Sequence, residues 1–147
     1  SGKPLSQPDK YVYNWVTCNQ AKGLSEGLYN KTENSVTSKL CSSYAWDTML
    51  EFIKRQHSDW ITNTIDENTK DKGLAIQKTG YHSINNIYDI GGNITEWTTE
   101  NYSKDESYVY RGGDMSGFAA SYPVARRGVY DSSNILDCFG FRLALFL

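Results

Sequence analysis

The sequence has no long hydrophobic run and no excess of positive charge. Its apolar stretches are all far shorter than the roughly 18 residues of a membrane-spanning helix, and its mean hydropathy is −0.58. The formal net charge is −2 at pH 7, which argues against a basic surface for nucleic acid. We therefore expect neither membrane insertion nor a nucleic-acid partner.

Cysteine and histidine are scarce. The three cysteines, Cys18, Cys41 and Cys138, form no CxxC pair and lack the spacing of zinc ligands. Because an odd number of cysteines cannot complete a disulfide framework, we expect three reduced, buried thiols; one disulfide with a free thiol is the alternative. The two histidines, His57 and His82, are too few for a three-histidine metal centre.

Sequence motifs of common active sites are absent as well. The chain contains no GxSxG, HExxH, P-loop or GxGxxG sequence. Gly112 and Gly113 are not followed by the Lys-Ser/Thr pair of a phosphate-binding loop. Asp89, Glu96 and Glu100 lie close together in the sequence, and we interpret them as a surface cluster. The sequence thus predicts no catalytic residue.

The chain is long enough to form one domain, and it is rich in aromatic side chains. Its 147 residues can bury one core without disulfides or a metal. Aromatic residues make up 14% of the sequence, with 11 Tyr and 4 Trp. Tyrosine-rich surfaces are typical of recognition proteins, and a tyrosine-rich β core is the alternative interpretation.

The start of the chain differs from the rest in composition. It begins at Ser1-Gly2 rather than at a methionine, so we expect a piece of a longer protein. Residues 1–10, with Pro4 and Pro8, are predicted to be a lead-in or a remnant of processing. Residues 11–147 are predicted to form a single domain.

Two helices are predicted in the first half of the chain. Thr17, followed by Gln20, has the pattern of a capping box at the start of a helix over residues 17–28. Ser42 or Ser43 caps a second helix. Its apolar residues recur at the spacing i, i+3, i+4, i+7, which predicts one buried face; they are Trp46, Met49, Leu50 and Ile53.

Short strands and long loops are predicted around and after these helices. Polar composition predicts loops at residues 30–39 and 62–82. Alternating apolar residues predict a closing strand over residues 141–146, which should be central and mostly buried. The other predicted strands are residues 11–16, 94–97 and 107–111. Together these elements predict an α+β fold with a small antiparallel sheet.

Four motifs in the second half of the chain match, in order, the framework motifs of one family. They are residues 86–98 (NIYDIGGNITEWT), Arg111-Gly112-Gly113, Pro123 with Arg127, and residues 140–145 (GFRLAL). Residues 11–147 therefore resemble the formylglycine-generating-enzyme (sulfatase-modifying factor) type of the C-type-lectin-like fold. This resemblance implies two helices, a small twisted antiparallel sheet and long loops. It indicates a fold more specifically than an activity.

The family that the chain resembles has three branches with different functions. Its formylglycine-generating enzymes use two cysteines shortly after the Gly-Gly motif, where this chain has Gly117 and Tyr122, so copper–thiolate chemistry has no ligands here. Its iron-dependent sulfoxide synthases use several histidines, and this chain has two. Its third branch, which includes the variable proteins of diversity-generating retroelements, is not enzymatic and displays a changeable ligand-binding surface.

The composition of the last part of the chain bears on the third branch. Residues 116–147 contain no Met, Trp, Gln, Lys or Glu, whereas residues 1–115 contain 27 residues of these five types. In retroelement-diversified genes, codons that begin with adenines are randomised at their first two positions and keep a pyrimidine at the third, and such codons encode none of the five. A β-rich, apolar tail would also disfavour Lys and Glu. The composition therefore favours the third branch without deciding it.

The resemblance places a ligand-binding variable region at about residues 114–138. Aromatic and arginine side chains are the usual anchors of binding surfaces. The residues predicted to contact a ligand are Met115, Phe118, Tyr122, Arg126, Val129, Tyr130, Ser132, Asn134 and Leu136. We expect Arg111, Arg127 and Arg142, in or beside framework motifs, to pair with carboxylates or loop carbonyls.

Asn93 and Glu96 are candidate calcium ligands, by resemblance to similar turns in the enzyme branch. Ca²⁺ takes about six to eight oxygens, and the sequence offers two side chains here together with backbone carbonyls. The alternative, which we favour, is that Asn93 holds the turn and Glu96 makes a buried polar contact. No other cofactor is expected.

These observations predict a non-catalytic domain that recognises a protein or glycan ligand on a target surface. We expect it in an extracellular, cell-surface or phage-virion setting. One alternative is a relative of the formylglycine-generating oxidoreductases that has lost its catalytic cysteines. Another is a structural module of a phage tail or surface protein.

Overall fold

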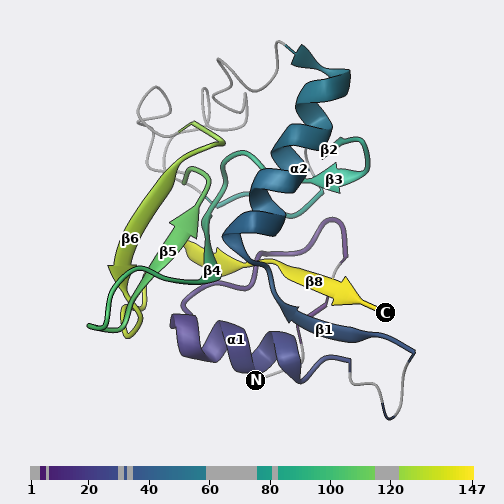
Figure 1. Cartoon of the computed structure of the whole chain (residues 1–147). Coiled ribbons are helices and arrows are strands. Elements are labelled where there is room, and N and C mark those ends of the chain that lie inside the picture. Colours follow the sequence, from purple (N-terminus) through teal and green to yellow (C-terminus); the bar gives the residue numbers. More distant parts are fainter. Residues whose placement is uncertain are drawn as a thin grey trace.

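The fold combines two helices with short strands (Figure 1). The computed structural model describes residues 4–5, 7–29, 32, 35–58, 76–80, 83–114 and 123–147. Within them lie α1 (Cys18–Glu26), α2 (Ser43–Gln56), β1 (Thr37–Leu40), β2 (Ser83–Ile84), β3 (Ile87–Tyr88), β4 (Thr95–Asn101), β5 (Ser107–Arg111), β6 (Arg127–Asp131), β7 (Phe139–Phe141) and β8 (Leu143–Phe146). None of the helices in these ranges has the length and apolar character to cross a bilayer.

Both predicted helices are present, and local sequence explains where each begins. Thr17 caps α1: its hydroxyl accepts the Gln20 N–H at 3.1 Å, and the Gln20 side chain accepts the Thr17 N–H at 2.9 Å, so the capping box is confirmed. Ser42 caps α2 by accepting the Ala45 N–H at 3.1 Å. The predicted apolar face of α2 is buried at Trp46, Leu50 and Ile53 and partly buried at Met49.

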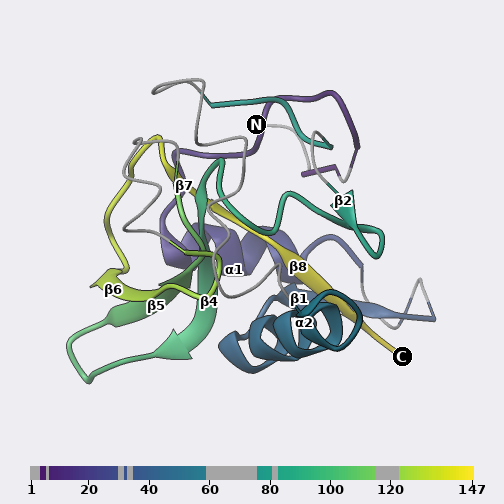
Figure 2. The same cartoon turned by 90° about the horizontal axis from the view of Figure 1, so that it is seen from above.

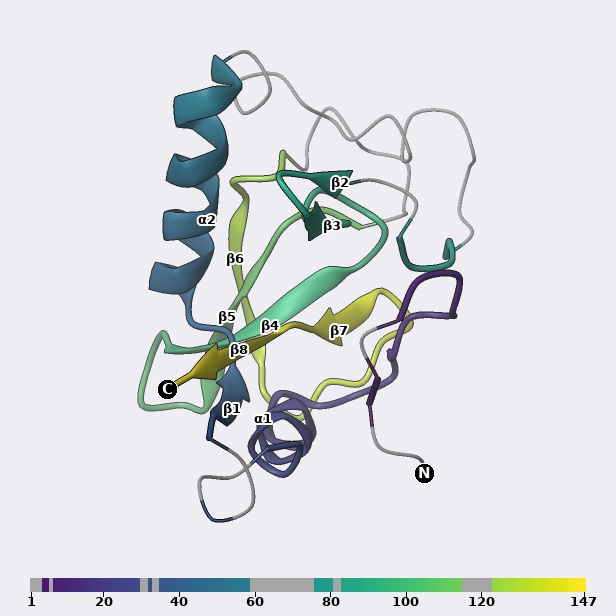
Figure 3. The ribbon, with the colours of Figure 1, turned by 90° about the vertical axis from the view of Figure 1, so that its right-hand side faces the viewer.

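The central sheet has the strand order β6-β5-β4-β7 (Figure 3). β6, β5 and β4 are antiparallel neighbours, but β7 pairs with β4 in parallel, with Phe141 opposite Trp97. The prediction of a small antiparallel sheet is therefore confirmed for β6, β5 and β4, and the parallel pairing of β7 makes the sheet mixed. The parallel pair arises because β7 belongs to a distant segment that returns alongside β4 in the same direction. α1 packs beside β1 and β4, and α2 packs beside β4 and β5.

The closing segment forms two strands rather than the one predicted. β7 stays in the four-stranded sheet, whereas β8 leaves it and pairs with β1, with Leu143 opposite Leu40 (Figure 2). Arg142 lies at the junction and turns its guanidinium toward Glu96. The prediction of a central, mostly buried strand is therefore wrong for β8, where Leu145 is 56% exposed.

The first residues and the loop before β1 also differ from prediction. Residues 11–16 form no strand: Tyr11 makes an isolated bridge with Lys78, and Trp15 has φ 55°, which is incompatible with extended backbone. Part of the predicted loop at 30–39 is β1, because β8 supplies a partner strand that local sequence does not reveal. Most of the predicted loop at 62–82, His82 included, lies outside the described residues.

In the part of the chain that the structure describes, the apolar core has two clusters, one beside each helix. Trp97, with no exposed surface, lies in the cluster beside α1, together with Val16, Cys18, Ala21, Leu40, Tyr110 and Phe139. Trp46, 1% exposed, lies in the cluster beside α2, together with Leu50, Ile53, Ile90 and Val124. The cluster beside α1 includes Trp97 of β4 and Tyr110 of β5, and α2, which supplies most of the other cluster, also packs beside these two strands.

Two glycines of the fold should respond to alanine in opposite directions. A Cβ at residue 128 would lie 2.3 Å from the Tyr110 ring, so Gly128→Ala should lower the free energy of unfolding by about 1–3 kcal/mol through overpacking. A Cβ on Gly23 of α1 would meet no heavy atom within 4 Å, so Gly23→Ala should raise it by about 0.5–1 kcal/mol. Urea unfolding of both variants checks this, and a shift of the same sign in both would contradict it.

Candidate binding surface

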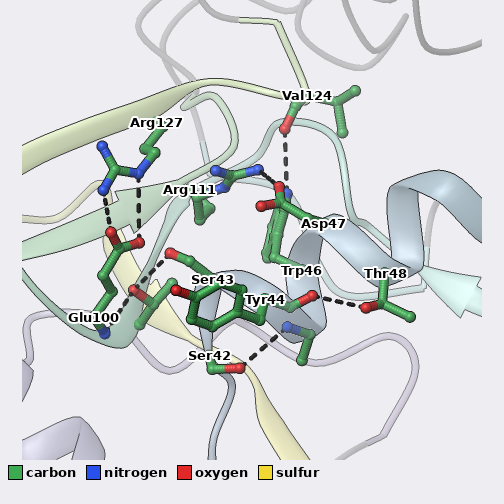
Figure 4. Close-up of polar contacts among 12 residues, drawn as sticks. Ser42, Ser43, Tyr44, Trp46, Asp47, Thr48, Glu100, Arg111, Val124 and Arg127 are labelled. Atoms are coloured by element: carbon green, nitrogen blue, oxygen red, sulfur yellow. Dashed lines mark hydrogen bonds and ion pairs between the residues drawn. The ribbon is translucent and has the colours of Figure 1, made fainter.

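The segment between β5 and β6 is held at both of its ends (Figure 4). At the β5 end, the guanidinium of Arg111 forms an ion pair with Asp47 of α2, and the Arg111 side chain is only 5% exposed. At the β6 end, the indole N–H of Trp46 donates to the carbonyl of Val124 at 3.4 Å. α2 therefore fixes where the chain leaves β5 and where it returns to β6.

A backbone hydrogen bond brings these two ends together. The Gly112 N–H donates to the Arg126 carbonyl at 3.2 Å. Residues 115–122, between the ends, lie outside the described residues. Three predicted contact residues fall there: Met115, Phe118 and Tyr122.

The three arginines of the framework motifs all pair with carboxylates, as predicted. Arg127 pairs with Glu100 of β4 (Figure 4), and its guanidinium lowers the pKa of the Glu100 carboxyl. Arg142 donates to both oxygens of Glu96, each at 2.9 Å, and also to two backbone carbonyls. Together with the pair made by Arg111, these contacts tie α2 and the loop before β4 to the sheet.

One face of β5 and β6 carries a row of aromatic and arginine side chains. Tyr130 is 41% exposed and packs against Phe139 with 5.6 Å between ring centroids. Arg126 donates to the Tyr110 hydroxyl at 2.9 Å, and its guanidinium lies 5.3 Å from the Tyr110 ring centroid. Gly128, opposite Tyr110 in the ladder, leaves room for that ring. Tyr130 and Arg126 therefore each rest on a buried aromatic ring, Phe139 and Tyr110 respectively.

The remaining predicted contact residues differ in accessibility. Val129 and Asn134 are half-buried, and Leu136 packs partly against the core. Ser132 is 1% exposed, because its N–H and its carbonyl are both bonded to neighbouring segments. Its side chain therefore does not reach this surface.

The turn after β6 exposes Ile135, a residue that the sequence interpretation missed. The carboxylate of Asp131 accepts the N–H of Ser133 at 2.8 Å and its hydroxyl at 2.5 Å, and these bonds lower the pKa of Asp131. Ile135, two residues on, is 47% exposed. Asp followed by Ser two residues later is a turn signal. The sequence therefore did indicate a turn here, and with it the exposure of Ile135.

The candidate calcium ligands are both engaged by other groups. The side-chain oxygen of Asn93 accepts the Gln77 N–H at 2.8 Å, and its amide donates to the Gln77 carbonyl at 3.1 Å. Burial raises the pKa of Glu96, and the guanidinium of Arg142 offsets part of that rise. Among the described residues, no three His, Cys, Asp or Glu side chains are grouped to hold a metal. The described contacts are those of a turn-holding amide at Asn93 and a buried ion pair at Glu96.

Comparison with known protein families shows which family the chain belongs to. The family model for the sulfatase-modifying factor enzyme 1-like domain matches residues 20–146. The chain belongs to this family. No curated protein matches the chain.

Three solved structures share the fold of this sulfatase-modifying factor-like domain. PvdO from Pseudomonas aeruginosa has a TM-score of 0.72 and 18% identity, over 100% of this chain and 66% of PvdO. Variable protein 1 of Treponema denticola has a TM-score of 0.68 and 16% identity, over 91% and 70% of the two chains. CarF has a TM-score of 0.66 and 14% identity, over 90% and 66%. The chain thus spans about two thirds of these proteins, and the expected formylglycine-generating-enzyme type of fold is confirmed.

The cysteines of this sulfatase-modifying factor-like domain are all free, as predicted. Cys18 and Cys41 are buried, whereas Cys138 is half-buried rather than buried. Burial raises the pKa of Cys18 to about 12, and of Cys41 and Cys138 to about 11 each. At neutral pH these thiols are protonated, and a protonated thiol is neither a good nucleophile nor a metal ligand.

Proposed function

We propose that this domain is a non-catalytic member of its family that binds a protein or glycan on a target surface. The binding surface is residues 114–138, as in retroelement-diversified variable proteins. The observation that carries the proposal is the anchoring described above: Arg111, Trp46 and Arg127 fix the segment at its base, while Tyr130 and Ile135 reach solvent. Exposed side chains carried on such an anchored framework change at little cost in stability, because exposed substitutions usually shift it by about 0.5 kcal/mol or less.

The composition of the tail supports the same proposal. Randomising the first two positions of a codon that ends in a pyrimidine cannot produce Met, Trp, Gln, Lys or Glu. Residues 116–147 contain none of these five amino acids. The fold shared with the Treponema denticola variable protein 1 is consistent with this use. An extracellular, cell-surface or virion location follows from the proposal, since the ligand lies on a target surface.

Two other functions compete with this proposal. A family oxidoreductase would need an ionisable thiol, and the three cysteines here have raised pKa values, with Gly117 and Tyr122 where the enzymes have cysteines. A structural module of a phage tail or surface protein would use the same fold without a changeable surface. Variation of the gene distinguishes this second alternative from ligand binding.

Sequencing the gene from many independent isolates should show amino-acid differences concentrated at exposed positions of residues 114–138. Tyr130 and Asn134 should vary, because their codons can begin with two adenines in a template copy. Arg111 and Arg127 should stay constant, because each holds the base of the segment through an ion pair. A reverse-transcriptase gene should lie nearby. Differences spread evenly over the chain would contradict a diversified surface.

A catalytic assay separates the enzyme alternative. The domain, with and without added copper, is incubated with a cysteine-containing sulfatase-type peptide and the product is analysed by mass spectrometry. We expect no conversion of cysteine to formylglycine, since no described thiol is poised as a thiolate. Measurable turnover would overturn the non-catalytic assignment.

A further inference from the structure

Trp15 is an exposed aromatic residue in a backbone conformation that tryptophan rarely adopts. It lies just before α1, and 59% of its surface is exposed. Its φ of 55° is in the left-handed region, where a bulky side chain is an outlier and Gly or Asn is favoured. The position costs free energy twice, through backbone strain and through apolar surface left in water. Core packing therefore does not account for a tryptophan here.

The residues on both sides of Trp15 hold it in this position. Val16 is 3% exposed, and its carbonyl accepts the indole N–H of Trp97 at 3.0 Å. On the other side, the Asn14 side chain donates to the Asp137 carbonyl at 2.8 Å, where the segment before α1 runs beside the one that leads into β7 (Figure 3). Strained residues persist only where their surroundings fix them, and they concentrate at ligand sites. A fixed backbone thus presents the indole of Trp15 to solvent.

An open groove of about 480 Å³ surrounds Trp15. The rings of Tyr13 and Trp15 and the amides of Asn14 and Gln20 line it, together with aliphatic side chains. Its volume falls in the range of small-molecule sites, which are about 300–1,000 Å³. None of the described residues that line it carries a charge, so a charged ligand would lose water without gaining an opposite charge. The lining therefore favours a neutral ligand.

The two amides of the groove are each oriented by an internal hydrogen bond. The Gln20 side-chain oxygen accepts the Thr17 N–H at 2.9 Å, so the NH₂ group of this exposed side chain carries the donors that a ligand can use. The Asn14 NH₂ group donates to Asp137, so its side-chain oxygen is the acceptor that a ligand can use. Groups that are fixed before binding lose little entropy when a ligand arrives. The groove thus offers a fixed donor and a fixed acceptor beside two aromatic rings.

A neutral sugar has the chemistry that matches these features. One face of a pyranose ring consists of C–H groups, which pack against the electron-rich face of an aromatic ring. Its hydroxyls both donate and accept hydrogen bonds, as the two amides require. An apolar protein patch would cover the indole of Trp15 but would leave both amides without partners, which costs free energy.

We propose that the groove around Trp15 binds a pyranose ring of a neutral glycan. The sugar stacks on the indole, and its hydroxyls bond to the amides of Asn14 and Gln20. The proposal is independent of the proposed function, because none of the residues that line the groove belongs to residues 114–138, although the bond from Asn14 to Asp137 places the groove beside that segment. A protein contact at Trp15 is the competing use.

Titration of the intact chain with four neutral trisaccharides, one each of glucose, galactose, mannose and N-acetylglucosamine, tests the proposal. We expect at least one of them to bind saturably, with a Kd in about the millimolar range, and to protect tryptophan fluorescence from quenching by acrylamide. Trp46 and Trp97 are buried and should contribute little to this protection. No saturable binding by any of the four would overturn the proposal and leave a protein contact as the use of Trp15.

Trp15→Asn separates binding from stability. It should weaken sugar binding at least about tenfold, yet melt at the wild-type temperature or above, because Asn tolerates a φ of 55°. Tyr102→Asn, at a residue that is 62% exposed and lies outside the groove, should leave binding unchanged. Equal sugar affinity in the two variants would refute the proposal. A melting temperature that falls together with binding would assign Trp15 a structural role instead.

A second pair of variants tests the amide of Gln20. Gln20→Glu keeps the oxygen that accepts the Thr17 N–H and loses the two NH₂ donors, so α1 should stay capped while sugar binding weakens. Gln56→Glu makes the same change at an exposed residue of α2 outside the groove and should leave binding unchanged. Equal sugar affinity in these two variants would contradict hydrogen bonding by the Gln20 amide, on which the choice of a sugar depends.

Discussion

Trp97→Ala should lower the free energy of unfolding by about 3–5 kcal/mol, the usual cost of deleting a buried aromatic side chain. Trp97 has no exposed surface. Its indole N–H donates to the Val16 carbonyl at 3.0 Å, and its ring lies 4.5 Å from that of Phe139. The substitution therefore leaves a cavity between α1 and the sheet and also strands a buried carbonyl.

Trp97→Phe is the matched control, because it keeps an aromatic ring and loses the indole N–H. We expect it to cost clearly less than the alanine variant. Urea unfolding followed by circular dichroism gives both values. A loss under about 1.5 kcal/mol for Trp97→Ala, below the range for core deletions, would mean that the cluster beside α1 does not carry the stability of the domain.

Arg142→Ala should cost about 3 kcal/mol or more at neutral pH, because removing one partner leaves the other charge buried without compensation. Glu96 is 7% exposed, and its two carboxylate oxygens both accept from Arg142. Replacing both partners, as in Glu96→Leu with Arg142→Met, should cost less than the single change, since an apolar pair of similar volume needs no solvation.

The loss of stability in the Arg142→Ala variant should depend on pH in a defined direction. Burial raises the pKa of Glu96 above its ordinary value of 4.5, and loss of Arg142 removes the offset. A carboxyl whose pKa is higher in the folded state takes up protons on folding, so its charge costs stability at neutral pH and that cost fades as the pH falls toward 4.5. The deficit of Arg142→Ala relative to wild type should therefore be smaller at pH 5 than at pH 7. Equal deficits at the two values would refute this account of the pair.

The helices could be predicted from the sequence because their signals are local. Thr17 and Gln20 stand three residues apart, and the apolar face of α2 is complete within eight residues, 46–53. β1 was not predicted, and β7 and β8 were predicted as one closing strand, because the pairing of each depends on a partner far along the chain. Nothing within 30–39 shows that residues 143–146 will lie beside it.

The candidate site was predictable to a similar extent. That Arg111 pairs with a carboxylate follows from its place in a framework motif, but Asp47 is 64 residues away in the sequence and no local pattern names it. Burial of Ser132 depends on backbone bonds to two remote segments. The residues that anchor a surface can therefore be predicted from a sequence more readily than the side chains that are exposed on it.

The pairing of the last strands has a consequence for how the protein is made. β7 completes the sheet beside β4, and β8 completes the sheet beside β1, so neither sheet closes until residues 139–146 have left the ribosome. Until then the edges of β1 and β4 stay open, and open edges attract other chains. Contacts between such distant segments also slow folding. During synthesis the growing chain is therefore unprotected at two edges until residues 139–146 emerge.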